Sequence, residues 1–269
     1  MNAHKNIKPD NHVRVGILAE RNENGEVSIC ERWARPFEKA GMNIEYIPVD
    51  AENIDEILDR IHGLLLPGGD SNINPYFYDP GQLDDHLSVA QQRDIARDRT
   101  AIALVQKAYG LNIPTLGICR GMQEMLVAFG GALETLNTQI NHAQGYDAVL
   151  ADGTRCFETM DRPVHEIEIV SGGLLDSIYD KKNFFVNSIH TQGITREFWQ
   201  HDRNKNLRKI FRIEAYAPDG VIEAISTHRE HEKRFFVGLQ AHFELPGALH
   251  ISIFTPFRRE IRDYAANKA

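Results

Sequence analysis

The sequence predicts an α/β fold with a mixed, mostly parallel central sheet flanked by helices. In the first half of the chain, short apolar runs that suit buried strands alternate with amphipathic stretches that suit helices. In the second half, several short strands follow one another, and one pair is joined by a tight turn. The 269 residues are 42% hydrophobic and 25% charged, which is the composition of a folded globular chain rather than a disordered one.

The first half of the chain is predicted to alternate strands with helices. Gly41 is expected to end the first helix, and the strand at 63–66 runs into the turn Pro67-Gly68-Gly69. The stretch 84–110 lacks proline and has apolar residues at near-helical spacing, so it predicts one amphipathic helix. The predicted strands are 13–18, 43–49, 63–66 and 114–118, and the predicted helices are 31–41, 54–60, 84–110 and 122–129.

The second half is predicted to add shorter strands and a last helix. Pro218-Asp219-Gly220 predicts the turn of a hairpin between strands 210–216 and 221–226. Further strands are expected at 164–170, 184–189 and 235–244, followed by a helix over 248–266 that is interrupted near Pro256. Residues 137–163 have the weakest pattern and are expected to form a long surface loop over a site. We therefore expect a flexible segment at 1–12 and a single domain over 13–269.

Charge and cysteine content restrict the class of protein. There are 30 Lys and Arg against 38 Asp and Glu, so the formal charge is −8, which argues against binding along a nucleic-acid backbone. This balance suits amine-bearing substrates better than polyanions. The sequence predicts neither a signal peptide nor a membrane span. The three cysteines, an odd and sparse number, predict free thiols and a cytoplasmic location.

Cys119 is the candidate nucleophile. It lies in Gly117-Ile118-Cys119-Arg120-Gly121, between a predicted strand and a helix whose apolar residues repeat at helical spacing and which ends at Gly130-Gly131. A strand that enters a helix through one residue makes a tight turn, and the flanking glycines remove Cβ atoms that would clash there. The helix N-terminus then points at the sulfur and favours the thiolate. Cys30 and Cys156 have no such setting and are expected to have no catalytic role.

His242 and Glu244 are the candidate base and the group that orients it. If the strand at 235–244 reaches them, both side chains point to the same face. Glu244 could then hold one ring nitrogen of His242 while the other faces the thiol, as in Cys–His–acid triads. The chain has 12 histidines, so the spacing alone favours an edge-strand histidine beside a solvated glutamate. The tight turn at Cys119 is what favours the catalytic interpretation.

With these residues, the chain resembles the class I glutamine amidotransferase superfamily, and within it the gamma-glutamyl-gamma-aminobutyrate hydrolase family. The resemblance implies a flavodoxin-like α/β fold and extends over nearly the whole chain. It departs from the family at Phe243, where the family usually has proline between the histidine and the glutamate. The segments that carry the resemblance are 63–69, 116–124, 186–192, 218–224 and 238–244.

The resemblance implies a mechanism in which Cys119 attacks the γ-carbonyl of a glutamyl amide and forms a thioester that water hydrolyses. Backbone N–H groups of Gly69 and Arg120 would hold the oxyanion. It also implies that the glutamyl group lies near Gln123 and that a polar strand end faces the substrate, although strand-end capping is an equally open interpretation. The residues of that strand end are Asn187, Ser188, His190 and Gln192.

No metal and no organic cofactor is expected. The segment 228–231 contains two histidines, but it lacks matching ligands and is expected to be a solvated loop. His142 is expected to be a surface histidine rather than part of the amine side of the site.

Three functions remain open at this point. The first is a stand-alone hydrolase of small γ-glutamyl amides, such as γ-glutamyl-γ-aminobutyrate or a γ-glutamyl polyamine. The second is a glutaminase subunit that delivers ammonia to a separate synthase. The third is a non-catalytic regulatory homologue, for which Phe243 is the only support. The expected partner is a small substrate and not a nucleic acid or a membrane, and association into a homo-oligomer stays open.

Overall fold

The structure is a computed structural model, and it describes residues 12–21, 27–69, 71–79, 89–143, 162–228, 235–245 and 251–268. The predicted flexible segment 1–12 lies outside these ranges except for His12. Cys156, residues 229–231 and most of the predicted loop 137–163 also lie outside them. Within the described ranges, no helix combines the length and the apolar character that crossing a membrane requires.

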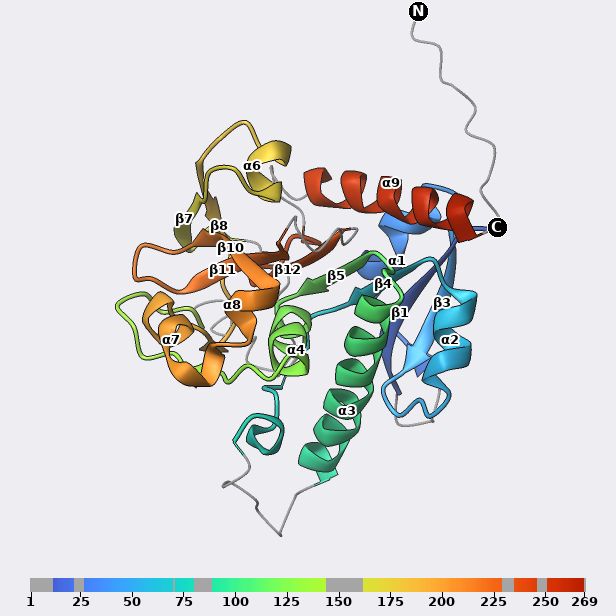
Figure 1. Cartoon of the computed structure of the whole chain (residues 1–269), viewed down its shortest axis with the longest axis horizontal. Helices are drawn as coiled ribbons and strands as arrows, with labels where there is room; N and C mark the ends of the chain where they lie inside the picture. The colour runs from blue at the N-terminus through green and yellow to red at the C-terminus, as the bar shows by residue number, and fades with distance from the viewer. Residues whose placement is uncertain are drawn as a thin grey trace, which may run out of the picture.

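A central sheet organises the molecule (Figure 1). Among the described residues it has ten strands in the order β2-β1-β4-β5-β12-β11-β10-β7-β8, with β3 paired to β1. The strands of this sheet are β1 (Arg14–Arg21), β2 (Val27–Ser28), β3 (Asn43–Pro48), β4 (Gly63–Leu66), β5 (Thr115–Ile118), β7 (His165–Ile169), β8 (Asn183–Val186), β10 (Phe211–Tyr216), β11 (Ile222–Thr227) and β12 (Phe236–Leu239). A separate two-stranded sheet pairs β6 (Glu134–Thr135) with β9 (Gln192–Gly193).

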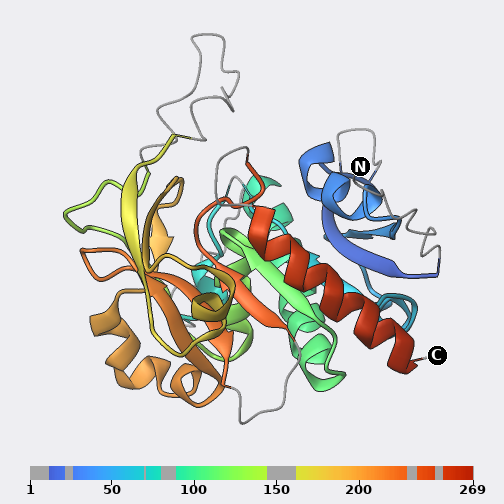
Figure 2. The same ribbon diagram turned by 90° about the horizontal axis from the view of Figure 1, so that it is seen from above.

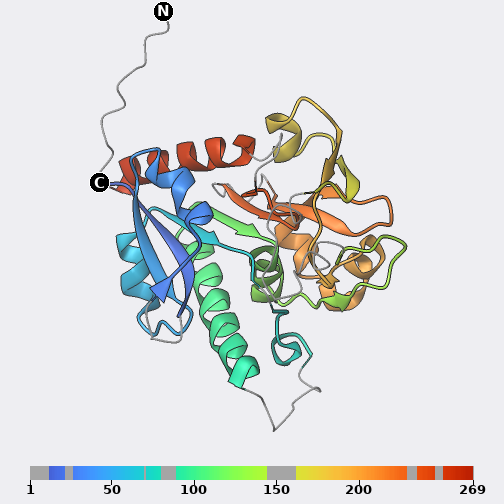
Figure 3. The same ribbon diagram turned by 180° about the vertical axis from the view of Figure 1, so that it is seen from behind.

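The sheet has a parallel part and an antiparallel part. Strand β1 runs parallel to β3 and β4, and β5 runs parallel to both β4 and β12. From β12 outward through β11, β10, β7 and β8, every pairing is antiparallel. Seen from behind, the N-terminal strands lie at one end of the sheet and the β10–β11 hairpin lies toward the other (Figure 3). The predicted mixed sheet flanked by helices is therefore confirmed.

Helices cover both faces of the sheet. Buried side chains of α1 (Glu31–Glu38) and α9 (Ile251–Lys268) belong to one core cluster, which lies on the face that α9 crosses in Figure 2. The opposite face is covered by α2 (Ile54–Arg60), α3 (Val89–Gly110) and α4 (Arg120–Ala128), whose apolar side chains form a second cluster. Strands β4 and β5 are consequently buried on both faces, which is why they are continuous apolar runs.

Shorter helices complete the second half of the chain. Their apolar residues, such as Leu175, Trp199 and Leu207, are buried in one of the two core clusters. These elements are α6 (Leu174–Ile178), α7 (Arg196–Gln200) and α8 (Leu207–Ile210), with the 3₁₀ turns η1 (Pro75–Phe77) and η3 (Asp202–Asn204). The sequence pattern does not predict them, because a helix of four or five residues is too short to show a periodicity.

Several predicted boundaries are wrong. Strand 235–244 ends at Leu239, because Leu239 pairs with Ile118, the last residue of β5, and beyond it only β11 remains as a neighbour. Strand 184–189 ends at Val186 for the same reason, since Val186 pairs with the first residue of β7. Helix 31–41 ends at Glu38, and Gly41 takes a φ of +77° in the turn toward β3.

The predicted interruption near Pro256 is also wrong. Helix α9 continues through Pro256 from Ile251 to Lys268. A proline inside a helix removes one backbone hydrogen bond. On either side of Pro256, Ile253 and Phe257 are fully buried in the same core cluster, and this packing holds the two parts of the helix together.

Candidate active site

Cys119 occupies a strained turn between β5 and α4. Its φ is +53°, and it is one of two non-glycine residues with positive φ among those described. A Cβ at Gly121 would lie 2.1 Å from the backbone oxygen of Leu66, and a Cβ at Gly117 would lie 2.6 Å from the backbone of Gly121. Both positions therefore require glycine, and the predicted strand–turn–helix geometry around Cys119 is present.

The candidate site lies where the parallel strands β4, β5 and β12 end side by side. Cys119 follows β5 directly, and its backbone N–H donates to the carbonyl of Leu239 at 2.7 Å. The turn after β4 brings Gly68 against the imidazole of His242, since a Cβ on Gly68 would lie 2.7 Å from Cε1 of that ring. The carboxyl ends of parallel strands thus bring together the candidate nucleophile, the candidate base and the glycine turn.

His242 contacts both of its expected partners. Its Nδ1 lies 2.7 Å from Oε1 of Glu244, and its ring also forms a side-chain hydrogen bond with Cys119. Burial acts to lower the pKa of His242, but the Glu244 carboxylate and the Cys119 sulfur together hold it well above the ordinary value. The site therefore favours the imidazolium form of His242 beside the Cys119 sulfur.

Neighbouring residues hold the side chains of Glu244 and His242 in place. The Glu244 side chain is fully buried, and Arg32 of α1 lies 3.6 Å from it. The ring of Trp33 lies 6.5 Å from the ring of His242, centroid to centroid. Phe243, which replaces the usual proline, is buried in the same core cluster as Trp33. Its side chain fills apolar space, and the contact between His242 and Glu244 is kept.

A buried ion-pair network lies beneath the glycine turn. Arg97 of α3 pairs with Glu124 at 2.8 Å and donates to the carbonyl of Pro67 at 2.7 Å. Arg120 pairs with Asp98 at 2.5 Å, and its Nε lies 3.4 Å from Glu124. Burial raises the pKa of Asp98 to about 6 although Arg120 acts in the opposite direction. Such pairs are costly to bury and often serve position rather than stability.

This network continues into the segment that follows the glycine turn. The second carboxylate oxygen of Asp98 accepts the backbone N–H of Asn74 at 2.8 Å, and the Arg120 guanidinium donates to the hydroxyl of Ser71. The side chain of Gln192 accepts the N–H of Ile73 at 3.1 Å from the other side. The backbone that carries Gly69 is therefore fixed by buried charges on one side and an amide on the other.

The predicted substrate residues Asn187 and Ser188 both bond within the protein. Asn187 makes a reciprocal pair with the backbone of His242, accepting its N–H at 2.8 Å and donating to its carbonyl at 3.0 Å. Ser188 donates to the carbonyl of His142 at 3.0 Å. Asn187 is thus placed to position His242, the candidate base.

Gln123 and Gln192 join α4 to the segment after β8. Gln123 donates to the carbonyl of Gln192 at 2.8 Å, and Nδ1 of His190 lies 3.0 Å from that same carbonyl. The sulfur of Cys119 lies 3.9 Å from the carbonyl of Ile189. The segment 187–192 therefore borders the nucleophile, and its predicted residues lie near the candidate site.

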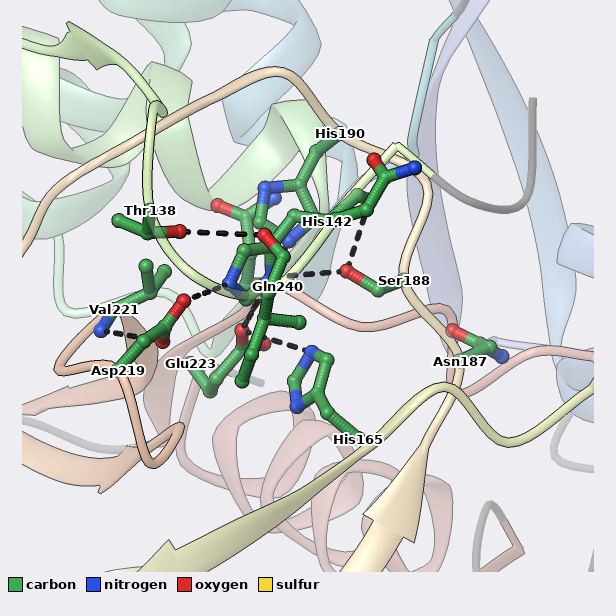
Figure 4. A network of polar contacts seen from close by, with 12 residues as sticks. Thr138, His142, His165, Asn187, Ser188, His190, Asp219, Val221, Glu223 and Gln240 are labelled. Atoms are coloured by element: carbon green, nitrogen blue, oxygen red, sulfur yellow. Dashed lines mark hydrogen bonds and ion pairs between the residues drawn. The ribbon is translucent and has the colours of Figure 1, made fainter. Parts of the chain in front are cut away.

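A second group of polar side chains lies beside this segment (Figure 4). His142, His165, His190 and Glu223, here called the buried histidine cluster, are each 5% exposed or less. The expectation that His142 lies on the surface is wrong, because its backbone and side chain bond to residues 188 and 190 across the loop. Burial lowers the pKa of His165 to about 4 and raises that of Glu223 to about 8.

Sequence reasoning missed the residues that support the site. Glu223 follows the Pro218-Asp219-Gly220 turn within one of the segments that carry the family resemblance, and a carboxylate inside a buried strand was a usable signal. His165 occupies the apolar face of a strand, which was a second signal. Arg97 and Asp98 gave none, because their partners lie far away in the chain.

Known proteins resemble this chain both in sequence and in fold. The sequence model of the Peptidase C26 family matches residues 15–244. The chain is 32% identical over 245 residues to gamma-glutamyl-gamma-aminobutyrate hydrolase PuuD of Escherichia coli strain K12, covering 87% of this chain and 86% of that protein. The solved glutaminase domain of Trypanosoma brucei CTPS with bound acivicin has a TM-score of 0.61 at 16% identity, covering 96% of this chain and 95% of that one. The Thermotoga maritima glutamine amidotransferase has a TM-score of 0.55 at 15% identity, covering 94% and 85%.

Proposed function

Because the chain belongs to the Peptidase C26 family and is a cysteine-dependent hydrolase, we propose that it cleaves the γ-glutamyl amide bond of small γ-glutamyl amines, such as γ-glutamyl-γ-aminobutyrate. The observation that carries this proposal is the contact of His242 with both Cys119 and Glu244 at the end of the parallel strands. The likeness to gamma-glutamyl-gamma-aminobutyrate hydrolase PuuD supports the choice of substrate class.

In the proposed first step, the Cys119 thiolate attacks the γ-carbonyl carbon of the substrate. The raised pKa of His242 keeps the imidazolium beside the sulfur, so the same ring has a proton to give to the leaving amine. Glu244 accepts the other ring N–H and fixes the orientation of the ring. The products of this step are a glutamyl thioester on Cys119 and the free amine.

The oxyanion of this step is proposed to bind the backbone N–H groups of Arg120 and Gly69. Arg120 begins α4, so its N–H points from a helix N-terminus toward the site. The ion pairs and hydrogen bonds around 67–74 keep the Gly69 backbone in place before the substrate binds. Donors that need no rearrangement contribute about 3 kcal/mol each to acyl transfer.

In the second step, water attacks the thioester. After the amine has received its proton, His242 is neutral and can take a proton from this water. Glutamate then leaves, and the thiolate–imidazolium pair forms again. The glutamyl group is proposed to lie beside Gln123 and the segment 187–192, where Asn187 acts through the backbone of His242 and Gln192 through the backbone near Ile73.

We propose further that residues 13–269 act as one cytoplasmic domain. The central sheet takes strands from both halves of the chain, and the two cysteines in the described part, Cys30 and Cys119, are free thiols.

The proposed function is tested by measuring amine release from a panel of γ-glutamyl amides. The panel contains γ-glutamyl-γ-aminobutyrate, a γ-glutamyl diamine and glutamine, and the amine is quantified over time. The wild-type chain should turn over the first two, Cys119→Ala should lose activity at least about 10³-fold, and the exposed-cysteine control Cys30→Ala should retain it. Equal turnover by wild type and Cys119→Ala would contradict the proposal.

A further inference from the structure

The buried histidine cluster draws side chains from four separate segments toward one carboxylate (Figure 4). Glu223 comes from β11, His165 begins β7, and the other two histidines come from the segments around residues 142 and 190. The nitrogen atoms nearest to Oε1 of Glu223 lie 3.5 Å away on His142, 3.5 Å on His165 and 3.9 Å on His190. None of these contacts is short enough for a hydrogen bond.

The hydrogen bonds on the far side of each ring decide which nitrogen carries the proton. Nδ1 of His165 lies 3.1 Å from the carbonyl of Glu166, and Nδ1 of His190 lies 3.0 Å from that of Gln192. A carbonyl only accepts, so both Nδ1 atoms are protonated and both Nε2 atoms carry lone pairs. Nε2 of His142 lies 3.0 Å from the Asp219 carboxylate, so its Nδ1 is the lone-pair atom.

Three ring nitrogens with lone pairs therefore face the Glu223 carboxyl group, and there are too few protons to form a hydrogen bond at each of these acceptors. Both oxygens of Glu223 and the Nε2 atoms of His165 and His190 have no hydrogen-bond partner among the residues described. Nδ1 of His142 lies 3.1 Å from the Ser188 hydroxyl, but the single hydrogen of that hydroxyl is also directed to the His142 carbonyl. Buried acceptors that face one another in this way repel unless a cation lies between them.

The spacing of these acceptors selects the kind of cation. Ligands at 2.0–2.1 Å from a tetrahedral zinc ion lie about 3.4 Å apart. Acceptors around an ammonium nitrogen, each at a hydrogen-bond distance, would lie about 4.6 Å apart. The separations of 3.5 Å from Glu223 to His142 and to His165 fit the metal, and the ligand atoms of these three residues all lie within 4.8 Å of one another, whereas His190, 3.9 Å from Glu223, lies outside that group.

We propose that the buried histidine cluster binds one zinc ion through His142, His165 and one oxygen of Glu223, and that His190 moves in to take the fourth position. Each histidine ligand has the second hydrogen bond that metal-bound imidazoles use to fix their orientation: a carboxylate for His142 and backbone carbonyls for the other two. With His190, whose Nε2 lies 3.9 Å from Glu223, drawn into the fourth position, the buried site would be closed, which is the form of structural zinc.

The metal would tie the core of the antiparallel part of the sheet to the active-site segment. His190 directly follows Ile189, whose carbonyl lies 3.9 Å from the Cys119 sulfur. The backbone of Glu223 accepts the N–H of Gln240, two residues before His242. The ion is a positioning element in this proposal and takes no part in the bond-breaking steps.

The proposal is tested by metal titration of the full chain with all three cysteines replaced by alanine, so that no thiolate can hold the ion. The protein is stripped with a chelator and titrated with zinc, while bound metal and the unfolding temperature are measured. We expect one equivalent per chain and a rise in Tm of about 5 °C or more at saturation. Cobalt in place of zinc should give the visible absorption of a four-coordinate site with nitrogen and oxygen ligands.

Matched variants in the same cysteine-free chain locate the ion. Glu223→Gln and His165→Gln should lose the bound equivalent, and Asp219→Asn should weaken binding about 10–100-fold because it removes only the partner of His142. His201→Gln, at an exposed histidine outside the cluster, should keep full stoichiometry. Metal binding and the rise in Tm are first measured on the cysteine-free chain itself, so this part of the test holds even if a variant fails to fold.

Two results would overturn the proposal. One is a parent chain that binds less than half an equivalent of zinc or cobalt and gains no thermal stability. The other is an equivalent that persists in folded Glu223→Gln and His165→Gln. In the first case, stabilisation by ammonium would assign the cluster to an amine.

Discussion

At the scale of single residues, the site depends on a ring held between a carboxylate and a sulfur. The position of His242 is over-determined: Glu244 holds its Nδ1, Asn187 holds its backbone on both sides, and Gly68 leaves just enough room for its Cε1 atom. Changes of one atom or one methyl group at these positions should therefore affect catalysis before they affect folding.

Glu244→Gln should move the pH profile as well as lower the rate. The carboxylate raises the pKa of His242, so its removal lowers that pKa, and the imidazolium should lose its proton at lower pH. We expect a bell-shaped profile of kcat/KM for the wild type, with apparent pKa values that belong to the Cys119–His242 pair. The variant should be at least about 100-fold slower, with its alkaline limb shifted to lower pH.

This shift is measured by steady-state kinetics across pH 5–9 on the two proteins. An unchanged alkaline limb in Glu244→Gln would show that the carboxylate does not control His242. A flat wild-type profile would contradict the pairing itself.

Gly68→Ala should reduce kcat while leaving the protein folded. Its new Cβ would lie 2.7 Å from Cε1 of His242, so the ring must move. A displacement of about 1 Å in a catalytic group costs about 100-fold in rate. Kinetics and the thermal midpoint are measured together, and a variant with wild-type kcat would contradict the close approach.

At the scale of elements, the turn into α4 is determined by local sequence and by close packing. The strand, the turn and the helix around Cys119 were predictable, because the apolar run, the flanking glycines and the helical periodicity lie within about fifteen residues. The His242–Glu244 contact was predictable from its two-residue spacing. The end of the predicted strand 235–244 was not predictable, because β12 stops where its neighbour β5 ends.

Gly121→Ala should destabilise the protein through this packing. Its Cβ would lie 2.1 Å from the backbone oxygen of Leu66, and backbone in the centre of a sheet cannot move aside. We expect a loss of about 3 kcal/mol or more in the free energy of unfolding, measured with denaturant. The control Gly110→Ala, with nothing within 4 Å of its new Cβ, should change it by less than about 1 kcal/mol.

The ion pairs between α3 and α4 should be far more sensitive than those on the surface. Glu124→Gln removes the negative charge that pairs with the buried Arg97 and Arg120. Breaking such a buried pair lowers the free energy of unfolding by about 3–5 kcal/mol. Asp55→Asn breaks the exposed pair with Lys107 and should cost less than about 1 kcal/mol. Denaturant unfolding of both variants checks this, and equal losses would contradict the role given to the buried network.

At the scale of the whole molecule, the site is made by topology that no local pattern reveals. The site lies at the carboxyl ends of the parallel strands. Its residues come from α1, the turn after β4, α3, the β5–α4 turn and the segments that follow β8 and β12. The buried histidine cluster gathers side chains from residue 142 to residue 223, and the polar loop composition around His142 predicted a surface position for it. Such contacts follow from strand order, which periodicity does not supply.

The isolated chain should be active without a second protein. The Cys119–His242–Glu244 contacts and the supporting network are formed within one chain. We therefore expect turnover of γ-glutamyl amides by the purified chain at a rate that does not depend on added cell extract. Glutamine hydrolysis that appears only with a copurified synthase would instead support the glutaminase-subunit function.

The proposed mechanism requires Cys119 to carry the glutamyl group during turnover. The most direct test quenches the reaction with γ-glutamyl-γ-aminobutyrate in acid and maps the adduct by peptide mass spectrometry. We expect a glutamyl thioester on the peptide that contains Cys119, and it should decay as substrate is exhausted. Turnover with no adduct at Cys119, or with the adduct on Cys30 or Cys156, would contradict it.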